Sequence, residues 1–485
     1  MRALALVALA VLLGAGPAAA FDSTDPLVAK QWYLAADKAW SYWATQPPLA
    51  TVKVAIVDSG IDYRHPEFAG RIAGGESFVG GSWQHDSDGH GTFVAGEIAA
   101  DPGNGLGIAG LAFNAQLLVA KVVKPDGSVS LQGEIDAIRW AVDNGARVIN
   151  LSLGGVRDPE DPQLDTYSAL EQGAVQYAYA HGAVVVAAVG NGEESPSTPW
   201  RYADYPAALP HVIGVGAYGR TGDVPTFSNR DAAYVDLVAP GTAMFSTVPR
   251  NLLDTKSGPC PDGPYSDCGP YEFRNAIGTS FAAPQVSAAA ALLLGVDPSL
   301  RPDQVAWLLE RTARDATPAT GCSLCARGRD AFSGWGYLDV AAAVTALEKG
   351  VLPPADAHEP NDNAGTWAIH FGPPRTITAT LDYWDDQVDV YSIALRQGER
   401  IFVRLSPLQA AQTTVVLWKP GTQDVNGKHP PLRNEAARAL AVGSQQRIAY
   451  TAPVYGTYYI EVKLLHGTYM PVQYHLAVAT RQTGV

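Results

Sequence analysis

The chain has 485 residues, of which 47% are hydrophobic and 17% are charged. This composition is typical of a folded protein, and the length predicts two or three domains. The 48 acidic and 34 basic residues give a formal net charge of -14, which repels a phosphate backbone and argues against nucleic acid as a partner.

The N-terminus has the features of a secretory signal peptide, which we predict to span residues 1–20. Arg2 precedes an apolar run over residues 3–13, and small residues follow as far as Ala20. The run is shorter than the roughly 20 residues that a membrane span needs. We therefore expect cleavage after Ala20, no membrane span, and a secreted or extracellular protein, with the periplasm or the cell surface as further options.

Short apolar strands alternate with helical patterns between residues 52 and 347. Expected strands cover residues 52–57, 117–123, 148–151, 184–189 and 212–217, and expected helices cover residues 133–143 and 167–181. Continuous apolar strands separated by helices predict an α/β fold, with a mostly parallel sheet and helices on both faces. Functional residues in such sheets lie beyond the carboxyl ends of the strands, which is where Asp58 and Asn191 stand.

Three motifs supply a carboxylate, an imidazole and a hydroxyl. Asp58 ends the first strand, His90 opens an apolar run with a helical pattern, and Ser280 precedes a long Ala- and Leu-rich helix. Taken singly, each of these residues is more often a helix cap or a core residue than a catalytic residue. Together they form a nucleophile, a base that removes its proton, and a carboxylate that orients the base. We predict these roles for Ser280, His90 and Asp58.

The order Asp, His, Ser along the chain is that of subtilisin-like enzymes and differs from that of chymotrypsin-like enzymes and α/β-hydrolases. Residues 25–345 resemble the subtilisin-like serine peptidases, or subtilases. The matching motifs include Asp58-Ser59-Gly60-Ile61-Asp62, His90-Gly91-Thr92, Ser152-Leu153-Gly154-Gly155, Gly190-Asn191 and Gly278-Thr279-Ser280. The resemblance implies a subtilisin-like fold and a serine endopeptidase that acts on polypeptides. His90 and Asn191 disfavour the alternative of a sedolisin-type acid peptidase.

The resemblance also implies roles for residues around the triad. Asn191 matches the asparagine whose side-chain amide, together with the Ser280 N–H, binds the oxyanion. Two segments match the walls of the first specificity pocket, and the first of them also pairs with the substrate as an added strand. These segments are Ser152, Leu153 and Gly154, and Ala188, Val189 and Gly190. We interpret Glu193 and Glu194 as exposed loop acids, with a preference for basic substrate residues as the alternative.

A structural calcium site is implied by the Gly-rich residues 103–107, because the equivalent loop in the family wraps a calcium ion. Asp25, Glu67 and Asn104 offer oxygen ligands of the type that suits this ion. We expect no organic cofactor. Only about thirty residues separate the expected cleavage site from the first strand, so we expect the chain to fold without the long inhibitory prodomain of most secreted relatives or with another segment in its place.

Four cysteines in an exported chain favour two disulfides. Three pairings are possible, and we predict Cys260 with Cys268 and Cys322 with Cys325, each closing a short loop. Zinc binding is the alternative. Only Cys322 and Cys325 have the spacing of zinc ligands, and no histidine follows them closely.

A Pro-rich joint predicts a linker over residues 351–358, between a catalytic domain of residues 21–350 and a second domain of residues 359–485. Beyond it, strand-like runs between turn signals predict an all-β sandwich. These runs cover residues 377–381, 388–395, 400–405, 413–418, 447–451, 457–462 and 474–479. The motifs Glu359-Pro360-Asn361-Asp362 and Asp389-Val390-Tyr391 resemble the bacterial pre-peptidase C-terminal domain, which is appended to secreted peptidases.

The sequence therefore predicts a secreted, calcium-assisted serine endopeptidase that is a monomer. The alternative from another class is a catalytically inactive relative that acts as a binding or adhesion module through its β-sandwich. Asp58, His90, Ser280 and Asn191 are all present, which favours the enzyme.

Overall fold

The computed structural model describes residues 23–249, 273–353, 357–382, 386–425, 434–442, 445–465 and 471–482. The predicted signal peptide and the predicted pair Cys260 and Cys268 lie outside the described residues.

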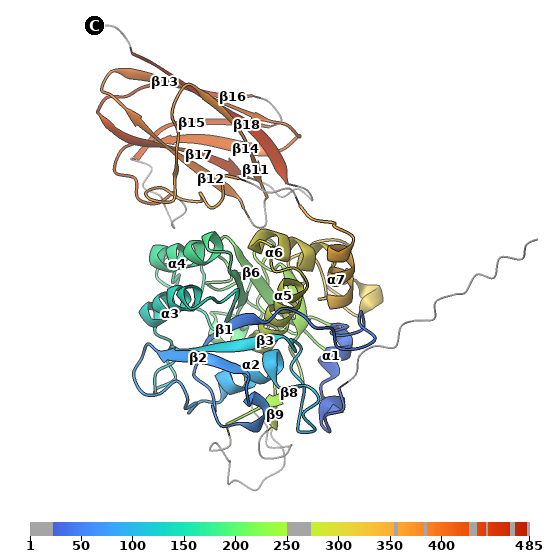
Figure 1. Ribbon diagram of the computed structural model, residues 1–485. Coiled ribbons are helices and arrows are strands. Elements are labelled where there is room, and N and C mark those ends of the chain that lie inside the picture. The colour runs from blue at the N-terminus through green and yellow to red at the C-terminus, as the bar shows by residue number, and fades with distance from the viewer. Residues whose placement is uncertain are drawn as a thin grey trace, which may run out of the picture.

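A seven-stranded parallel sheet forms the centre of the first part of the chain (Figure 1), in the strand order β2-β3-β1-β4-β5-β6-β7. Its strands are β1 (Val52–Asp58), β2 (Ile72–Ser77), β3 (Ala115–Lys121), β4 (Val148–Leu151), β5 (Val184–Ala188), β6 (Val212–Tyr218) and β7 (Leu237–Pro240). Strands β4 to β7 are buried along their whole length, which explains their continuous apolar sequences. The predicted parallel sheet is confirmed.

Helices cover both faces of this sheet, and neighbouring residues of β1 point to opposite cores. Val54 and Ile56 lie in a core with side chains of α1 (Trp32–Ala36), α2 (His90–Ala99), α5 (Ala283–Val296), α6 (Pro302–Arg311) and α7 (Val340–Glu348). Ala55 and Val57 lie in a second core with side chains of α3 (Leu131–Asp143) and α4 (Ala169–Ala180). The helices predicted over residues 133–143 and 167–181 correspond to α3 and α4, the helical run that His90 opens corresponds to α2, and the Ala- and Leu-rich helix after Ser280 corresponds to α5.

One helical stretch in the described ranges, Thr279–Val296, is long and apolar enough to cross a membrane by length and composition. It is 89% buried inside the protein, as the core helix of a soluble protein would be.

Short elements connect the larger ones. Strands β8 (Met244–Thr247) and β9 (Phe273–Ala276) form an antiparallel pair. The 3-10 helices are η1 (Val28–Lys30), η2 (Pro66–Phe68), η3 (Gly192–Glu194), η4 (Thr279–Phe281) and η5 (Pro318–Thr320). The helix η4 leads directly into α5.

A β-sandwich follows, drawn in orange and red in Figure 1. One sheet has the order β10-β12-β17-β14-β15 and the other β11-β18-β13-β16. The strands are β10 (Ile369–His370), β11 (Arg375–Leu381), β12 (Val388–Leu395), β13 (Glu399–Pro407), β14 (Gln412–Trp418), β15 (Glu435–Val442), β16 (Gln446–Thr451), β17 (Gly456–Leu464) and β18 (Val472–Gln482). Both sheets contribute to one core, with Ile393 and Val415 from the first and Val403 and Leu476 from the second. The all-β sandwich is confirmed. The resemblance to the pre-peptidase C-terminal domain stays a prediction with which this fold is consistent.

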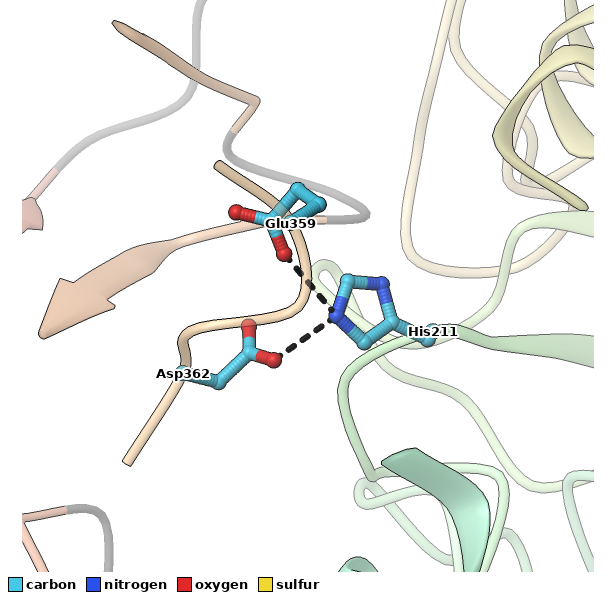
Figure 2. A group of neighbouring side chains, drawn as sticks. All are labelled: His211, Glu359 and Asp362. Atoms are coloured by element: carbon cyan, nitrogen blue, oxygen red, sulfur yellow. Dashed lines mark hydrogen bonds and ion pairs between the residues drawn. The ribbon is translucent and has the colours of Figure 1, made fainter. Parts of the chain in front are cut away.

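His211 joins the two parts of the chain (Figure 2). Its Nε2 atom lies 2.8 Å from Asp362 Oδ2 and 3.4 Å from Glu359 Oε2. The His211 side chain is only 2% exposed, and its ring stacks on Tyr179 of α4 with 3.8 Å between the ring centroids. Burial lowers the pKa of His211, but the charges and hydrogen bonds of Asp362 and Glu359 outweigh it and raise the pKa to about 10. His211 is therefore a buried cation at neutral pH.

The ion pair predicts a pH-dependent effect of the substitution His211→Gln. A raised histidine pKa stabilises the fold fully at pH values below the ordinary pKa, and this stabilisation is lost as the pH rises through about 10. We expect the variant to be less stable than the parent by about 3 kcal/mol at pH 6, because it leaves two buried carboxylates without their cation.

Thermal unfolding of both proteins at pH 6 and at pH 10.5 measures this effect. The difference in stability should shrink at the higher pH, where the parent also loses the charge. A difference of equal size at the two pH values would contradict the assignment of a charged His211.

Candidate active site

Asp58 and His90 meet where β1 ends and α2 begins. The His90 Nδ1 atom lies 2.9 Å from both carboxylate oxygens of Asp58. The Asp58 side chain is 2% exposed and the His90 side chain 22%. A carboxylate on Nδ1 keeps the proton on that atom, so Nε2 is the ring nitrogen that can accept a proton.

Gly91 permits this contact. A Cβ atom at position 91 would overlap the carbonyl oxygen of Gly60 and lie 3.2 Å from Asp58 Oδ1. The first turn of α2 therefore approaches the end of β1 more closely than any larger residue allows.

Burial has the largest effect on the pKa of His90, and it lowers the value. The charge of Asp58 and its hydrogen bond act in the opposite direction, and Asp88 and Asp86 add to them. The net result is a raised pKa. Asp58 thus stabilises the charged, imidazolium form of His90.

Asp86, which the sequence analysis did not single out, holds the loop before His90. Its buried carboxylate accepts hydrogen bonds from Ser59 Oγ at 2.9 Å, Gly89 N at 2.8 Å and Thr92 N at 2.9 Å. Ser59 Oγ in turn accepts from Gly91 N at 2.9 Å. Asp86 therefore ties the residue after Asp58 to the first turn of α2. In the sequence, only the position of Asp86 four residues before His90 could have indicated this role.

Ser280 lies in η4, at the entrance to α5. Its carbonyl oxygen accepts a hydrogen bond from Ser152 Oγ at 2.7 Å. The next residue, Phe281, packs its ring against the rings of His90 and Phe93, with centroid distances of 5.3 Å and 4.5 Å. These contacts bring Ser280 to the His90 side of the sheet. Among the described residues no hydrogen bond joins the Ser280 hydroxyl to His90, and such bonds are often long before substrate binds.

Asn191 is linked to the same turn. Its Oδ1 atom accepts hydrogen bonds from the N–H and the hydroxyl of Thr279, both at 3.1 Å. Because Thr279 holds the carbonyl oxygen, the NH2 group is the part of the amide that can donate to a substrate. Asn191 thus lies next to the residue that precedes Ser280.

The two predicted wall segments lie at the carboxyl ends of β4 and β5, and several of their side chains face inward. Ser152 is buried, with its hydroxyl bonded to Ser280. Ala188 and Val189 are buried in the two cores of the sheet. Leu153 and Gly190 are half-buried and Gly154 is exposed. Leu153, Gly154 and Gly190 are therefore the residues of the two segments that reach the surface.

The structure brings the predicted calcium ligands together. Asp25 accepts hydrogen bonds from Gly103 N at 2.7 Å and Gly105 N at 2.9 Å, while Asn104 Nδ2 donates to Glu67 Oε2 at 3.1 Å. Burial raises the pKa of Glu67 to about 7. A carboxylate oxygen that accepts one N–H keeps lone pairs for a cation, so these oxygen donors are compatible with calcium.

Within the described part of the chain, two other groups of side chains could hold a metal ion. In each, the ligand atoms lie within 4.8 Å of one another. They are His211, Glu359 and Asp362, shown in Figure 2, and Glu359, Asp386 and Asp389. The ion pairs of His211 already neutralise part of the first group, so the second is the more plausible cation site of the two.

Cys322 and Cys325 form a disulfide, with their Cα atoms 5.3 Å apart. This confirms one of the two predicted pairs and leaves no thiolates for zinc at these positions.

Comparisons with known proteins agree with this geometry. A family model described as the subtilase family matches residues 50–336. The chain is 39% identical to subtilisin DY of Bacillus licheniformis over 265 residues, which cover 54% of this chain and 84% of the relative. It is 38% identical to subtilisin E of Bacillus subtilis (strain 168) over 266 residues, which cover 54% of this chain and 61% of the relative.

A solved structure gives the same result at lower identity. A protease from Pseudoalteromonas arctica matches with a TM-score of 0.53 and 27% identity, over 67% of this chain and 99% of that one.

Proposed function

Because this chain belongs to the subtilase family and is a subtilisin-like serine protease, we propose that it is a secreted endopeptidase with Asp58, His90 and Ser280 as its catalytic triad. The contact of His90 Nδ1 with both oxygens of Asp58, 2.9 Å each, is the observation that carries the proposal. Secretion is supported by the signal-peptide features of residues 1–20. We expect the protein to act as a monomer.

The reaction begins when His90 Nε2 takes the proton of the Ser280 hydroxyl. The Ser280 oxygen attacks the carbonyl carbon of the peptide bond, and Asn191 and the Ser280 N–H stabilise the negative charge on the carbonyl oxygen. His90 then gives its proton to the leaving amine, the C–N bond breaks, and an acyl-enzyme remains. Water, deprotonated by His90, attacks this ester and releases the carboxylic acid product and the Ser280 hydroxyl.

The competing proposal is an inactive relative that binds other molecules through its β-sandwich. It requires no chemistry at Ser280. Covalent labelling of Ser280 by a serine-directed sulfonyl fluoride separates the two, because the reagent needs an activated nucleophile.

The substitution Ser280→Ala should abolish peptide hydrolysis while the protein still folds. Ser280 is partly exposed and its hydroxyl holds no hydrogen bond within the described residues, whereas its backbone carbonyl contact with Ser152 is kept. We expect turnover to fall by several orders of magnitude, because only binding and oxyanion stabilisation remain. Hydrolysis rates and the thermal unfolding temperature should be measured together. A folded variant that still cleaves peptides would overturn the triad.

The substitution Asp58→Asn should change the pH dependence of hydrolysis. General-base catalysis needs neutral His90, so kcat/KM rises as the pH increases through the pKa of His90. Removing the charge of Asp58 lowers this pKa, since that charge is the main effect that raises it. We therefore expect lower activity at every pH and an acid limb displaced to lower pH. If the acid limb of the variant's residual kcat/KM lies at the same pH as in the parent, this role for Asp58 is excluded.

Calcium is part of the proposal, held by Asp25, Glu67 and Asn104. These residues belong to three separate segments, so a bound ion would cross-link them. It would also offset the repulsion between the ionised carboxylates of Asp25 and Glu67. Because the ion binds only the folded site, stabilisation grows with the free calcium concentration.

We expect a chelator to accelerate thermal inactivation, and more strongly at pH 8 than at pH 6, since Glu67 with a pKa of about 7 is ionised only at the higher pH. Inactivation rates with calcium and with chelator should be compared in the parent and in Glu67→Gln, where the protection should disappear. The matched control is Asp389→Asn. Protection that survives in Glu67→Gln and is lost in the control would move the ion to the group formed by Glu359, Asp386 and Asp389.

A further inference from the structure

The outer face of the sheet β11-β18-β13-β16 carries a basic patch, although the chain as a whole has a net charge of -14. Along β13, Ile401, Val403 and Leu405 lie in the core of the sandwich, and the residues that alternate with them point outward. Two further arginines lie opposite these outward residues on the neighbouring strands. Figure 1 shows β13 and β16 on the side of the sandwich away from the catalytic domain. We call the following exposed residues the arginine face: Arg400, Phe402, Arg404, Arg447 and Arg481.

The arginine face contains two pairs of like charges. In the strand register Arg404 lies opposite Arg447 of β16, and Arg400 lies opposite Arg481 of β18. Like charges directly opposite each other destabilise a sheet. Within the described residues none of these four guanidinium groups forms an ion pair, and the hydrogen bond that Arg447 donates to Gln445 Oε1 leaves its charge unneutralised. An anion bound between the arginines would offset their repulsion.

Acidic residues are absent from the outward positions of the four strands as the structure describes them. The one acid within the bounds of these strands is Glu399, which shares the inward side of β13 and accepts the N–H of Arg396 at 2.9 Å. Charged side chains on edge strands can prevent pairing with other chains. That role does not explain the patch, because Arg400, Arg404 and Arg481 belong to β13 and β18, the two inner strands of the sheet.

Phe402 lies between the two arginine pairs and is 40% exposed. Its neighbours in the register are alanines on both sides, Ala449 of β16 and Ala479 of β18. Because these neighbours are small, the ring stands above the surface of the sheet. The guanidinium carbon of Arg400 lies 5.2 Å from the ring centroid. Residues two apart in a strand are separated by about 7 Å, so the arginine pairs flank the ring at about 14 Å from each other.

We propose that the arginine face binds an acidic polysaccharide whose sugars carry carboxylate groups, and so holds the protein on a polymer surface. Arginine binds a carboxylate through two parallel hydrogen bonds, which makes it the cation best suited to this group. Phe402 offers an apolar surface to the less polar side of a sugar ring, while carboxylates on either side of that ring reach the two arginine pairs. All five residues of the face are exposed, so a long polymer can pass across it.

Two other classes of anionic partner fit the arginine face less well. Duplex DNA carries one charge per about 1.7 Å of its axis, and a duplex that extends beyond the patch meets a chain with 48 acidic and 34 basic residues, which repels it. A protein that lies on a lipid surface buries several apolar side chains there, whereas Phe402 is the only large apolar residue of the arginine face. A polysaccharide with one carboxylate per sugar carries fewer charges and is repelled less.

Polygalacturonate, a polymer of sugar carboxylates, is the probe that tests the proposal. Isothermal titration calorimetry with the full chain should detect binding of polygalacturonate and none of uncharged dextran. The dissociation constant should rise at least about tenfold between about 0.1 M and about 1 M salt, because the Debye length falls from about 10 Å to about 3 Å over this range.

The double substitution Arg400→Gln/Arg404→Gln removes one member of each arginine pair. We expect it to raise the dissociation constant at least about tenfold, because two groups that form charge-assisted hydrogen bonds are lost. The matched control is Arg375→Gln/Arg438→Gln, which changes the net charge equally at two exposed arginines of the sandwich outside the arginine face. The control should change the dissociation constant by less than about threefold.

Unchanged thermal unfolding and unchanged peptide hydrolysis show that a variant is folded. If Arg400→Gln/Arg404→Gln does not fold, Arg447→Gln/Arg481→Gln removes the opposite member of each pair and should weaken binding to the same extent. The inference does not depend on chemistry at Ser280. The substitution Ser280→Ala should therefore leave the affinity for polygalacturonate unchanged, so this inference and the proposed function can fail separately.

Several results would overturn the proposal. If the parent protein does not bind polygalacturonate, the arginine face has no such ligand. If the control variant loses as much affinity as Arg400→Gln/Arg404→Gln, net charge alone causes the binding. Tighter binding of duplex DNA or of phosphatidylglycerol vesicles than of polygalacturonate would assign the face to nucleic acid or to a membrane instead.

Discussion

Parallel pairing of β1, β4 and β5 is the constraint on which the site depends. In this pairing Val57 lies opposite Leu151, and Leu151 opposite Ala187. The residues that follow these three strands must therefore emerge side by side at one edge of the sheet. Asp58, Ser152 and Asn191 all come from this edge. The hydrogen bonds of Ser152 and Asn191 to Ser280 and Thr279 then fix the start of α5 against it.

Much of this could be predicted from the sequence, because the information was local. Strand β5 is an unbroken run of apolar, mainly β-branched residues, and β6 is buried along its whole length. The motif order along the chain identified the triad candidates. Strand β2 was not predicted, since its sequence, IAGGES, contains two glycines and has no buried residue. Strands β10 and β15 were missed as well. The first has two residues, and alanine, which is common in the second, has a low β propensity.

Other features could not be predicted because they depend on segments far apart in the chain. Asp204 follows Asn191 in an irregular segment, and no local pattern marks it; only the folded chain places it under Gly190. Similarly, His211 and Asp362 are 151 positions apart.

Buried carboxylates in this site differ in the donors that surround them, and the donors indicate their roles. Asp86 accepts hydrogen bonds from several groups of the chain, none of which titrates near neutral pH, so it can only hold the loop in place. Asp58 faces a histidine that gains a proton in the proposed mechanism, so the contribution of Asp58 would increase as the imidazolium forms.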